Sequence, residues 1–450
     1  MNQPRISSNE MPVSILEART SMAAGRLDAR QLLDLTRAAA ERNESLNPLA
    51  HVDWAGAERQ ATNADMRRAQ GLPPGLLDGI PVSIKDLFCV DGMPTRGGTQ
   101  ARLPQVCQGE ATLVSRLRAA GAVIFGKTNM HEIALGATGE NVWTGDVRNP
   151  FNPAHQAGGS SSGAAVCVAT GIGMAGVGSD TGGSVRIPAA FCGIAGFKPS
   201  FGAIPLDNAL YLSWTCDHAG PLARNVADCG LLYEVMSGRS AAHGAVGRAP
   251  RLAVPADWLR GRLAGQVREN FEQVLALCRR LGATVEEVAL PNLPDAWTCY
   301  SPIVRAEAAW VHREVLAAGG EGFSPAVLEP MRLGEKLLAT EYIDALQVRS
   351  RVCADLDRGL RDVDALILPT TAVAAPLRGQ VEVPVEGGTM SVREAVLGQT
   401  LPFSLCGLPS LSLPSGLGQG LPLSMSLVGG RDQDAHVLAL GCWLEQALAG

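Results

Sequence analysis

The sequence predicts an α/β fold built on a large, mostly parallel β-sheet. Three observations support this prediction. Short apolar runs alternate along the chain with segments whose apolar residues have helical spacing. The chain has 450 residues, of which 46% are apolar, so it can form a large core. Only 18% of the residues are charged and 51 are glycine, which is typical of a compact enzyme with many tight turns.

The first 70 residues are predicted to be helical. Apolar residues recur at helical spacing in Ser14 to Ala24 and again in Asp28 to Glu41. Asp28 is a suitable N-cap for the second segment.

The next region alternates between strands and helices. The segment Gly79 to Lys85 follows a turn rich in proline and glycine and is predicted to be a buried strand. Further strands are predicted at Ala122 to Gly126 and Gly173 to Ser179, and helices at Ala111 to Ala120 and Ser161 to Thr170. This order favours parallel pairing, because each strand is followed by a helix that returns the chain.

The second half begins after a segment rich in Gly, Ala, Ser and Arg, Ser237 to Pro250, which is the best candidate for a linker. A strand at Arg251 to Val254 and a helix at Gly265 to Leu281 are predicted next, and residues 295–362 are mostly helical. The predicted elements that close the chain are strands at Ala365 to Leu368, Ser410 to Leu413 and Leu423 to Val428, and a helix at Ala435 to Leu448.

Charge and cysteine content exclude several classes of protein. The net charge is −6 and no basic run occurs, so nucleic acid is not expected as a direct partner. The polar N-terminus lacks a signal-peptide core, and no apolar run is suited to a membrane helix. The 11 cysteines have no metal-binding spacing and are interpreted as buried thiols. We therefore expect a cytoplasmic protein with no membrane partner.

Two Gly-Gly-Ser units are the most unusual feature of the chain. They end at Ser160 and at Ser184. Glycine allows backbone N–H groups to approach a ligand closely, so a glycine-rich turn before a serine can form an oxyanion hole. The alternative is that Ser184 is a helix N-cap, a position that serine favours.

A nucleophilic serine needs a base. His131 and His155 lie near the serines in sequence, although a structural role suits each of them as well. Arginine stays protonated, whereas a buried lysine can act as a base. The chain has only four lysines, namely Lys85, Lys127, Lys198 and Lys336. Lys85 ends a predicted strand, where catalytic groups of α/β sheets usually lie, whereas Lys127 is expected to pack or pair structurally.

Several separated stretches resemble the amidase signature family, in the right order. They are Gly79 to Leu87, Gly126 to Glu132, Gly158 to Pro199, Gly196 to Ser200 and Leu408 to Pro414. The resemblance implies one α/β domain over residues 1–450, with a large mixed, mostly parallel sheet between two layers of helices. Within it, residues 1–70 would form N-terminal helices, 71–236 the catalytic core, 251–362 an embedded helical region, and 363–450 the last strands and helix.

The resemblance also implies a Ser–cisSer–Lys triad. Ser184 would be the nucleophile, Ser160 the bridging serine after a cis peptide bond, and Lys85 the base. Burial would have to lower the pKa of Lys85, because an ordinary lysine is almost wholly protonated at neutral pH. The oxyanion hole would be formed by the N–H groups of Thr181, Gly182, Gly183 and Ser184. The substrate pocket would include Met130, Gly136, Trp143 and Gly159.

Residues around this site have simpler interpretations as well. Ser161 and Ser162 are interpreted as caps or supporting donors. Asp180 and Arg186 are expected to form a structural ion pair, with an acidic group of the substrate as a second option for Arg186. Four aromatic residues could line an apolar pocket or pack the core, and the sequence leaves both options open. They are Trp143 and, in the variable region around residues 295–345, Trp297, Tyr300 and Trp310.

The favoured function is an amidase that hydrolyses a small-molecule amide through an acyl-serine intermediate, with no metal or organic cofactor. The alternative is the A subunit of a glutamine-dependent tRNA amidotransferase, which the family resemblance associates with an Asp before a Pro-x-Asn-Leu-Ala-Gly stretch. The corresponding stretch here is Pro402 to Gly407, and no carboxylate lies between Ala395 and Leu401. A non-catalytic scaffold is a third hypothesis, and a homodimer is left open.

Overall fold

The computed structural model describes residues 11–103, 107–241 and 247–449. Most of its strands form one sheet of 11 strands in the order β1-β3-β2-β4-β6-β5-β12-β13-β9-β7-β8. These strands are β1 (Leu49–Val52), β2 (Pro81–Lys85), β3 (Val123–Thr128), β4 (Ala175–Asp180), β5 (Ala195–Lys198), β6 (His218–Ala223), β7 (Arg251–Val254), β8 (Thr284–Glu287), β9 (Ala365–Pro369), β12 (Ser410–Gly418) and β13 (Leu421–Val428). A separate hairpin pairs β10 (Glu382–Val385) with β11 (Gly388–Ser391).

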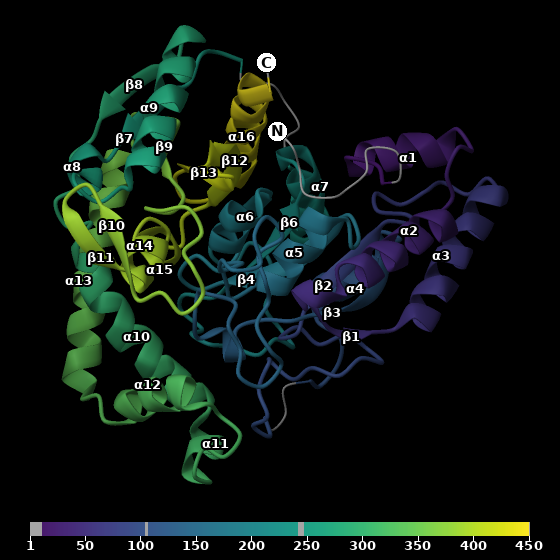
Figure 1. Ribbon diagram of the computed structural model, residues 1–450, viewed down its shortest axis with the longest axis horizontal. Coiled ribbons are helices and arrows are strands. Elements are labelled where there is room, and N and C mark those ends of the chain that lie inside the picture. Colours follow the sequence, from purple (N-terminus) through teal and green to yellow (C-terminus); the bar gives the residue numbers. More distant parts are fainter. Residues whose placement is uncertain (1–10, 104–106, 242–246, 450) are drawn as a thin grey trace.

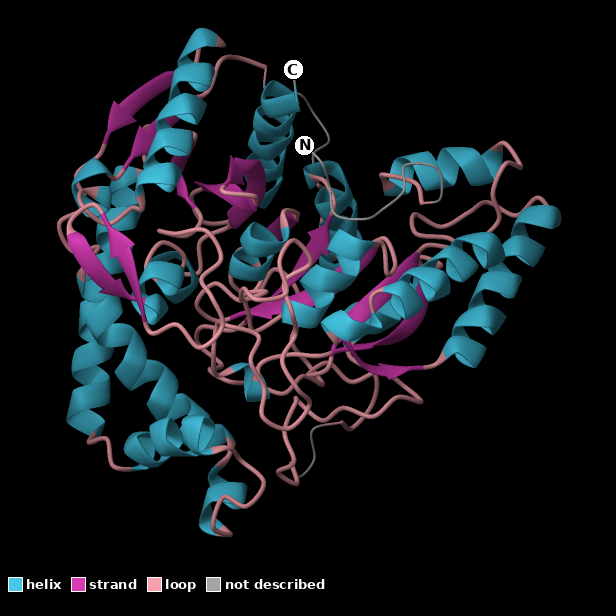
Figure 2. Ribbon diagram, viewed as in Figure 1, coloured by secondary structure: helices cyan, strands magenta, loops and turns pink. Residues whose placement is uncertain are grey.

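Helices flank the sheet (Figures 1 and 2). In the first half they are α1 (Ile15–Ala23), α2 (Ala29–Arg42), α3 (Trp54–Ala69), α4 (Thr112–Ala119), α5 (Ser162–Thr170), α6 (Arg186–Cys192) and α7 (Val226–Ser237), with short 3-10 turns at Glu44–Leu46 and Glu132–Ala134. In the second half they are α8 (Ala256–Leu259), α9 (Gly265–Arg280), α10 (Asp295–Val311), α11 (Arg313–Ala317), α12 (Pro325–Glu335), α13 (Ala339–Gly359), α14 (Val392–Leu397), α15 (Leu401–Leu405) and α16 (Asp434–Ala449).

The α/β class and the large mixed sheet are confirmed, but parallel pairing is less common than the sequence suggests. Within the described residues, four pairings of this sheet are parallel and six are antiparallel. The reason is visible between β12 and β13. Only Gln419 and Gly420 separate these strands, and both have positive φ angles, of 52° and 82°. Such a two-residue turn makes an antiparallel hairpin.

Most of the helices and strands predicted from the sequence are present, often with bounds within two residues of those predicted. The side chain of Asp28 caps α2 and forms a capping box with Gln31. The prediction of helix throughout the first 70 residues is wrong for Leu49–Val52, which pairs with β3 at the edge of the sheet. The expected helical region 251–362 also contributes β7 and β8 to the sheet. Of the predicted linker, residues 242–246 lie outside the described residues.

Helix α5 fills the space behind the central strands and brings the first Gly-Gly-Ser unit to its place. All nine of its residues are buried, and it packs against β4 and α6. Small side chains make this close packing feasible. A Cβ atom added at Gly163 would lie 2.5 Å from the backbone oxygen of Asn129, so no other residue fits there without a shift.

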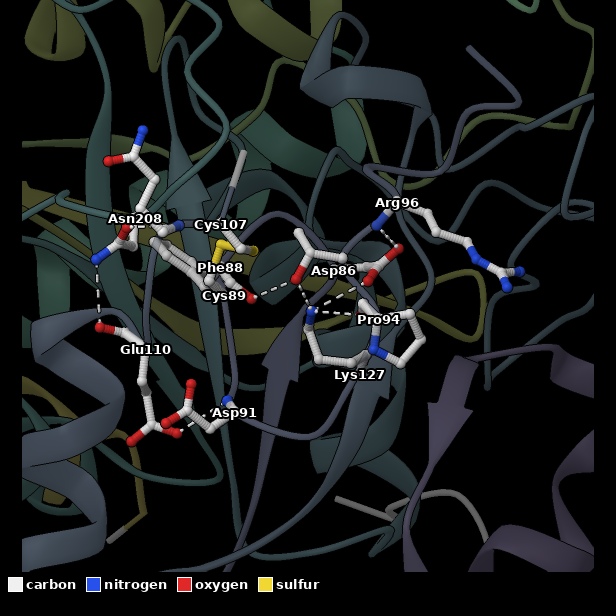
Figure 3. Close-up of a disulfide and its surroundings, with 12 residues drawn as sticks. Asp86, Phe88, Cys89, Asp91, Pro94, Arg96, Cys107, Glu110, Lys127 and Asn208 are labelled. Carbon is white, nitrogen blue, oxygen red and sulfur yellow. Dashed lines mark hydrogen bonds and ion pairs between the residues drawn. A yellow bond between two sulfur atoms is a disulfide. The ribbon is translucent and has the colours of Figure 1, made fainter. Parts of the chain in front are cut away.

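The interpretation of every cysteine as a free thiol is wrong for two residues. Cys89 and Cys107 form a disulfide, with their Cα atoms 5.5 Å apart (Figure 3). Sequence spacing could not reveal this pair, because connectivity depends on how loops meet in space. The other nine cysteines are free, seven of them buried and two half-buried.

The described helices do not include one that is both long enough and apolar enough to cross a membrane.

Candidate active site

Lys85 lies at the end of β2, inside the protein. Strand β2 runs parallel to β4, so both strands end at the same edge of the sheet. Its side chain is fully buried. The ammonium nitrogen Nζ donates hydrogen bonds to the Oγ atoms of three serines, Ser160 at 2.7 Å, Ser161 at 2.9 Å and Ser179 at 2.8 Å.

The surroundings of Lys85 favour its neutral form. Burial lowers the pKa of Lys85 to about 7, although Asp180 and Asp217 oppose this shift. No carboxylate among the described residues forms an ion pair with Nζ. Near neutral pH a large fraction of this amine is therefore unprotonated and can accept a proton from a hydroxyl group that it contacts.

Ser160 follows a cis peptide bond between Gly159 and Ser160, at the position that the family resemblance implies. The residue is fully buried, and its backbone oxygen accepts a hydrogen bond from the N–H of His131 at 3.2 Å. Helix α5 begins two residues later. The Ser160 hydroxyl is thereby held against the base.

Ser184 lies in the turn between β4 and α6 and is 5% exposed. Its backbone oxygen accepts a hydrogen bond from the N–H of Ser161 at 3.2 Å, which holds it beside the first Gly-Gly-Ser unit. Within the described part of the chain, its hydroxyl forms no hydrogen bond with Ser160. The N-cap of α6 is Val185, without a side-chain cap, so the interpretation of Ser184 as a helix cap is wrong.

The loop before Ser184 is held by side chains from distant segments. Thr181 Oγ1 donates to Asp217 Oδ1 at 2.6 Å, and Thr400 Oγ1 donates to the backbone oxygen of Gly182 at 2.7 Å. Gly183 has a φ angle of 141°, a conformation that favours glycine. The N–H groups of Gly182, Gly183 and Ser184 have no protein acceptor among the described residues. They are available to an anionic oxygen.

Asp180 and Arg186 form the ion pair that the sequence predicts. Arg186 donates to both carboxylate oxygens, at 2.9 and 3.0 Å, and both side chains are fully buried. Burial disfavours the charged carboxylate, but Arg186 outweighs it and holds the pKa of Asp180 below its usual range. The remaining N–H groups of Arg186 bond Thr400 at 2.9 Å and Ser404 at 2.6 Å. Arg186 cannot contact an acidic substrate, so that option is wrong.

The other candidate bases do not contact the two serine hydroxyls. Nδ1 of His131 lies 3.4 Å from Thr138 Oγ1, and burial lowers the pKa of His131 to about 4. Nδ1 of His155 lies 2.6 Å from the backbone oxygen of Ala375. Both histidines have structural partners.

Lys127 is paired structurally, as expected. Its Nζ lies 3.2 Å from Asp86 Oδ1 and donates to Thr95 Oγ1 at 2.8 Å and to the Pro94 carbonyl at 3.1 Å (Figure 3). Lys198 is also buried and donates to the Pro199 carbonyl at 2.9 Å. Neither lysine has a hydrogen bond to a serine.

Three of the expected pocket residues lie in closely packed surroundings. Met130 is fully buried and its carbonyl accepts from Asn141 at 2.9 Å. A Cβ atom added at Gly136 would collide with the ring of His131, and one added at Gly159 would lie 2.9 Å from the nitrogen of Gly139.

Trp143, the fourth expected pocket residue, is only partly buried. Its Nε1 donates to Glu132 Oε1 at 2.8 Å. It borders a hollow of about 920 Å³ whose described lining does not include Lys85, Ser160 or Ser184. Two of the aromatic residues that could line a pocket or pack the core, Tyr300 and Trp310, differ in their surroundings. Tyr300 lies against the Ser184 loop, whereas Trp310 is 58% exposed and packs edge-to-face on Trp214.

Sequence reasoning missed several residues that complete this site. Ser179 bonds Lys85, Asp217 holds Thr181, and Thr400 holds Gly182. Ser179 stands directly before Asp180 at the end of a predicted strand, which is a usable signal. Asp217 and Thr400 carry no such signal, because they are far from the motif in sequence. The interpretation of Ser161 as a cap or supporting donor omits its direct contact with Lys85, whose Nζ donates to Ser161 Oγ.

The chain resembles known proteins along most of its length. The model of the Amidase family matches residues 31–438. The A subunit of glutamyl-tRNA(Gln) amidotransferase from Symbiobacterium thermophilum is 36% identical over 432 residues, which cover 86% of each chain. The corresponding subunit from Roseiflexus castenholzii is 33% identical over 471 residues, covering 95% of this chain and 94% of that protein.

Solved structures agree with this similarity. One described as a crystal structure of an amidase has a TM-score of 0.93 at 46% identity and covers 96% of this chain and 99% of that one. A peptide amidase from Stenotrophomonas maltophilia has a TM-score of 0.80 at 26% identity, with 98% of both chains covered. The chain therefore belongs to the amidase family, the amidase signature enzymes, and is an enzyme that acts on carbon–nitrogen amide bonds.

Proposed function

We propose that this protein is an amidase that hydrolyses a carboxylic amide to the acid and ammonia or an amine. The observation that carries the proposal is the contact between the buried amine of Lys85 and the hydroxyl of Ser160, at 2.7 Å, with no carboxylate of the described residues paired to that amine. A neutral lysine in contact with a serine is a general base with a route for the proton.

In this mechanism Ser184 Oγ attacks the amide carbonyl while its proton passes through Ser160 to Lys85. The N–H groups of the loop Thr181 to Ser184 would stabilise the oxyanion of the tetrahedral intermediate. The proton then returns to the nitrogen of the leaving group, the C–N bond breaks, and an acyl-serine remains. Water, deprotonated through the same two residues, hydrolyses this ester and restores Ser184.

The second candidate is the A subunit of a glutamine-dependent tRNA amidotransferase. The names of the curated relatives favour it. Two features of this chain count against it. The carboxylate closest before the segment 395–401, that of Glu394, pairs with Arg262 at 2.8 Å. In that segment Leu397 packs near Gly182, where a Cβ atom would lie 3.5 Å from the leucine Cδ2. An apolar side chain does not bind the ammonium group of glutamine.

The first experiment treats the protein with a small fluorophosphonate and measures its intact mass. We expect one adduct on the wild type, none on Ser184→Ala and slow labelling of Lys85→Ala. A panel of amides with ammonia detection follows. An unlabelled wild type, or equal labelling of Ser184→Ala, would contradict the mechanism.

The same assays separate the two candidates. A free-standing amidase releases ammonia from simple amides by itself. An A subunit would need its partner subunits and would release ammonia from glutamine. Two statements remain predictions from the sequence, namely a cytoplasmic location and the absence of a nucleic-acid partner. The sequence leaves open whether the protein is a homodimer.

A further inference from the structure

Helix α10 brings an uncommitted hydroxyl group next to the Ser184 loop. Tyr300 lies on this helix and is buried. A Cβ atom added at Gly182 would lie 2.5 Å from the hydroxyl oxygen of Tyr300, so that oxygen lies directly beside the loop. In Figure 1, α10 runs next to α15, and the two helices are in contact.

The hydroxyl of Tyr300 forms no hydrogen bond with any of the described residues. Burial raises the pKa of Tyr300, so the hydroxyl keeps its proton at neutral pH and can donate it in a hydrogen bond. Buried tyrosine hydroxyls usually have a partner. A hydroxyl without one, beside the loop of the nucleophile, is well placed for a group on the substrate.

One arginine on α14 and one on α10, Arg393 and Arg305, have no counter-ion among the described residues. Arg393 on α14 stacks on the ring of Trp297, with its guanidinium carbon 4.9 Å from the ring centroid. Trp297 and Tyr300 are three residues apart and share a face of α10, and the charge of Arg393 acts on that of Arg305, which is also on α10. Neither arginine forms a side-chain hydrogen bond or an ion pair within the described part of the chain.

A bound anion would relieve the repulsion between these two arginines. Two guanidinium groups near one another repel, and neither can lose its proton to relieve the repulsion. The carboxylate adjacent to Arg393 in sequence, Glu394, is already paired with Arg262. The side chain of Arg393 is exposed, so an anion from solvent can reach it. Arg186, in contrast, is closer to the nucleophile in sequence but has all its partners inside the protein.

We propose that Arg393, Arg305 and Tyr300 form a subsite for a carboxylate group carried by the amide substrate. The inference rests on the proposed amidase function and names its substrate class, an amide whose acyl chain ends in a carboxylate. A guanidinium group can donate two parallel hydrogen bonds to a carboxylate. The Tyr300 hydroxyl, beside Gly182, would contact the same acyl chain closer to the reacting carbonyl.

The test compares pairs of amides that differ only in charge. Each ω-carboxyl amide of a series with increasing chain length is assayed beside the neutral alkyl amide of the same length. We expect kcat/KM to be about tenfold or more higher for the charged member of the best pair. Arg393→Gln and Arg305→Gln should each remove most of this preference and leave the neutral amide unaffected. Tyr300→Phe should lower kcat/KM for both amides.

Arg313 provides the matched control. It also stacks on a tryptophan, Trp310, at 4.2 Å, but that tryptophan is exposed and packs on Trp214 rather than on the Ser184 loop. Arg313→Gln should leave the preference for the charged amide unchanged. Equal activity on both amides in the wild type, or an equal loss in Arg313→Gln, would overturn the inference.

Failure of the proposed amidase function would give a different result from failure of the carboxylate subsite. In that case neither amide of any pair releases ammonia, whereas failure of the subsite leaves hydrolysis without a charge preference. Calorimetric binding of glutarate and of butyrate then tests the subsite without turnover. Tighter binding of glutarate that Arg393→Gln abolishes supports the subsite. Equal or absent binding overturns it.

Discussion

Lys85 and Lys127 occupy neighbouring positions and differ in what surrounds them. They lie at the ends of the parallel strands β2 and β3, where Ile84 is opposite Lys127, and both side chains are fully buried. Lys127 has a carboxylate partner, Asp86, at 3.2 Å. Lys85 has three serine hydroxyls and, in the part of the chain that the structure describes, no carboxylate partner. Burial lowers the pKa of both amines, but at Lys127 the charge of Asp86 opposes the shift directly.

The comparison shows that burial alone does not identify a base. Lys198 is a third buried lysine, and burial, together with Arg186, lowers its pKa to about 7 as well. Its hydrogen bond goes to the Pro199 carbonyl, which cannot supply a proton. What distinguishes Lys85 is a hydroxyl partner that can transfer a proton to it.

The largest expected effect comes from replacing each lysine by arginine. Lys85→Arg should lower kcat by about a hundredfold to ten-thousandfold, because a guanidinium group cannot serve as a base. Lys127→Arg retains the charge opposite Asp86 and should keep most of the activity per folded molecule. Single-turnover kinetics on the amide, normalised to folded protein, measure this. A comparable loss in Lys127→Arg would show that the two lysines do not have separate roles.

The second prediction concerns stability. Asp86→Asn leaves the buried charge of Lys127 without a partner and should lower the free energy of unfolding by about 3–5 kcal/mol. Urea denaturation followed by circular dichroism measures this change. The double variant Asp86→Asn with Lys127→Met should recover part of the loss, since it removes the unpaired charge. If the single variant is as stable as the wild type, the ion pair has no structural role.

The third prediction is a pH profile. Lys85 must be neutral to accept a proton, so kcat/KM should reach a plateau above the pKa of about 7 and decline below it. The decline should approach about tenfold per pH unit. Lys127→Arg should show the same profile. An acid limb at the ordinary pKa of lysine would mean that burial does not activate Lys85.

The smallest expected effects are those of alanine substitutions at two adjacent serines, Ser161 and Ser162. Ser161 bonds Lys85 at 2.9 Å and also bonds the backbone of Ser179 at 3.1 Å, both as donor and as acceptor. Ser161→Ala should therefore reduce kcat by about tenfold, since it removes one hydrogen bond that stabilises the Lys85 amine once it has accepted the proton. The Oγ atom of Ser162 is buried and has no partner among the described residues. Ser162→Ala should retain activity and thermal stability, and a loss in this variant would reveal a partner for Ser162.

The local features of this protein can be predicted from the amino-acid sequence. Apolar spacing and end signals located α2 with its Asp28 cap, β7 and most of the helices, because these depend on residues a few positions apart. The two Gly-Gly-Ser units marked the candidate site, and the family resemblance assigned roles to Lys85, Ser160 and Ser184. These three residues belong to motifs that can be recognised without knowing how the chain folds.

The contacts between distant residues are known only from the folded chain. It placed Asp217 on Thr181, Thr400 on Gly182, and Tyr300 beside the same loop. It also made most strand pairings antiparallel and joined Cys89 to Cys107. Such contacts join segments far apart in the sequence, and periodicity carries information only about neighbours along the chain. The same reason explains why Lys85 and Lys127 look alike in sequence. Their difference lies in the partners that the fold brings to each amine.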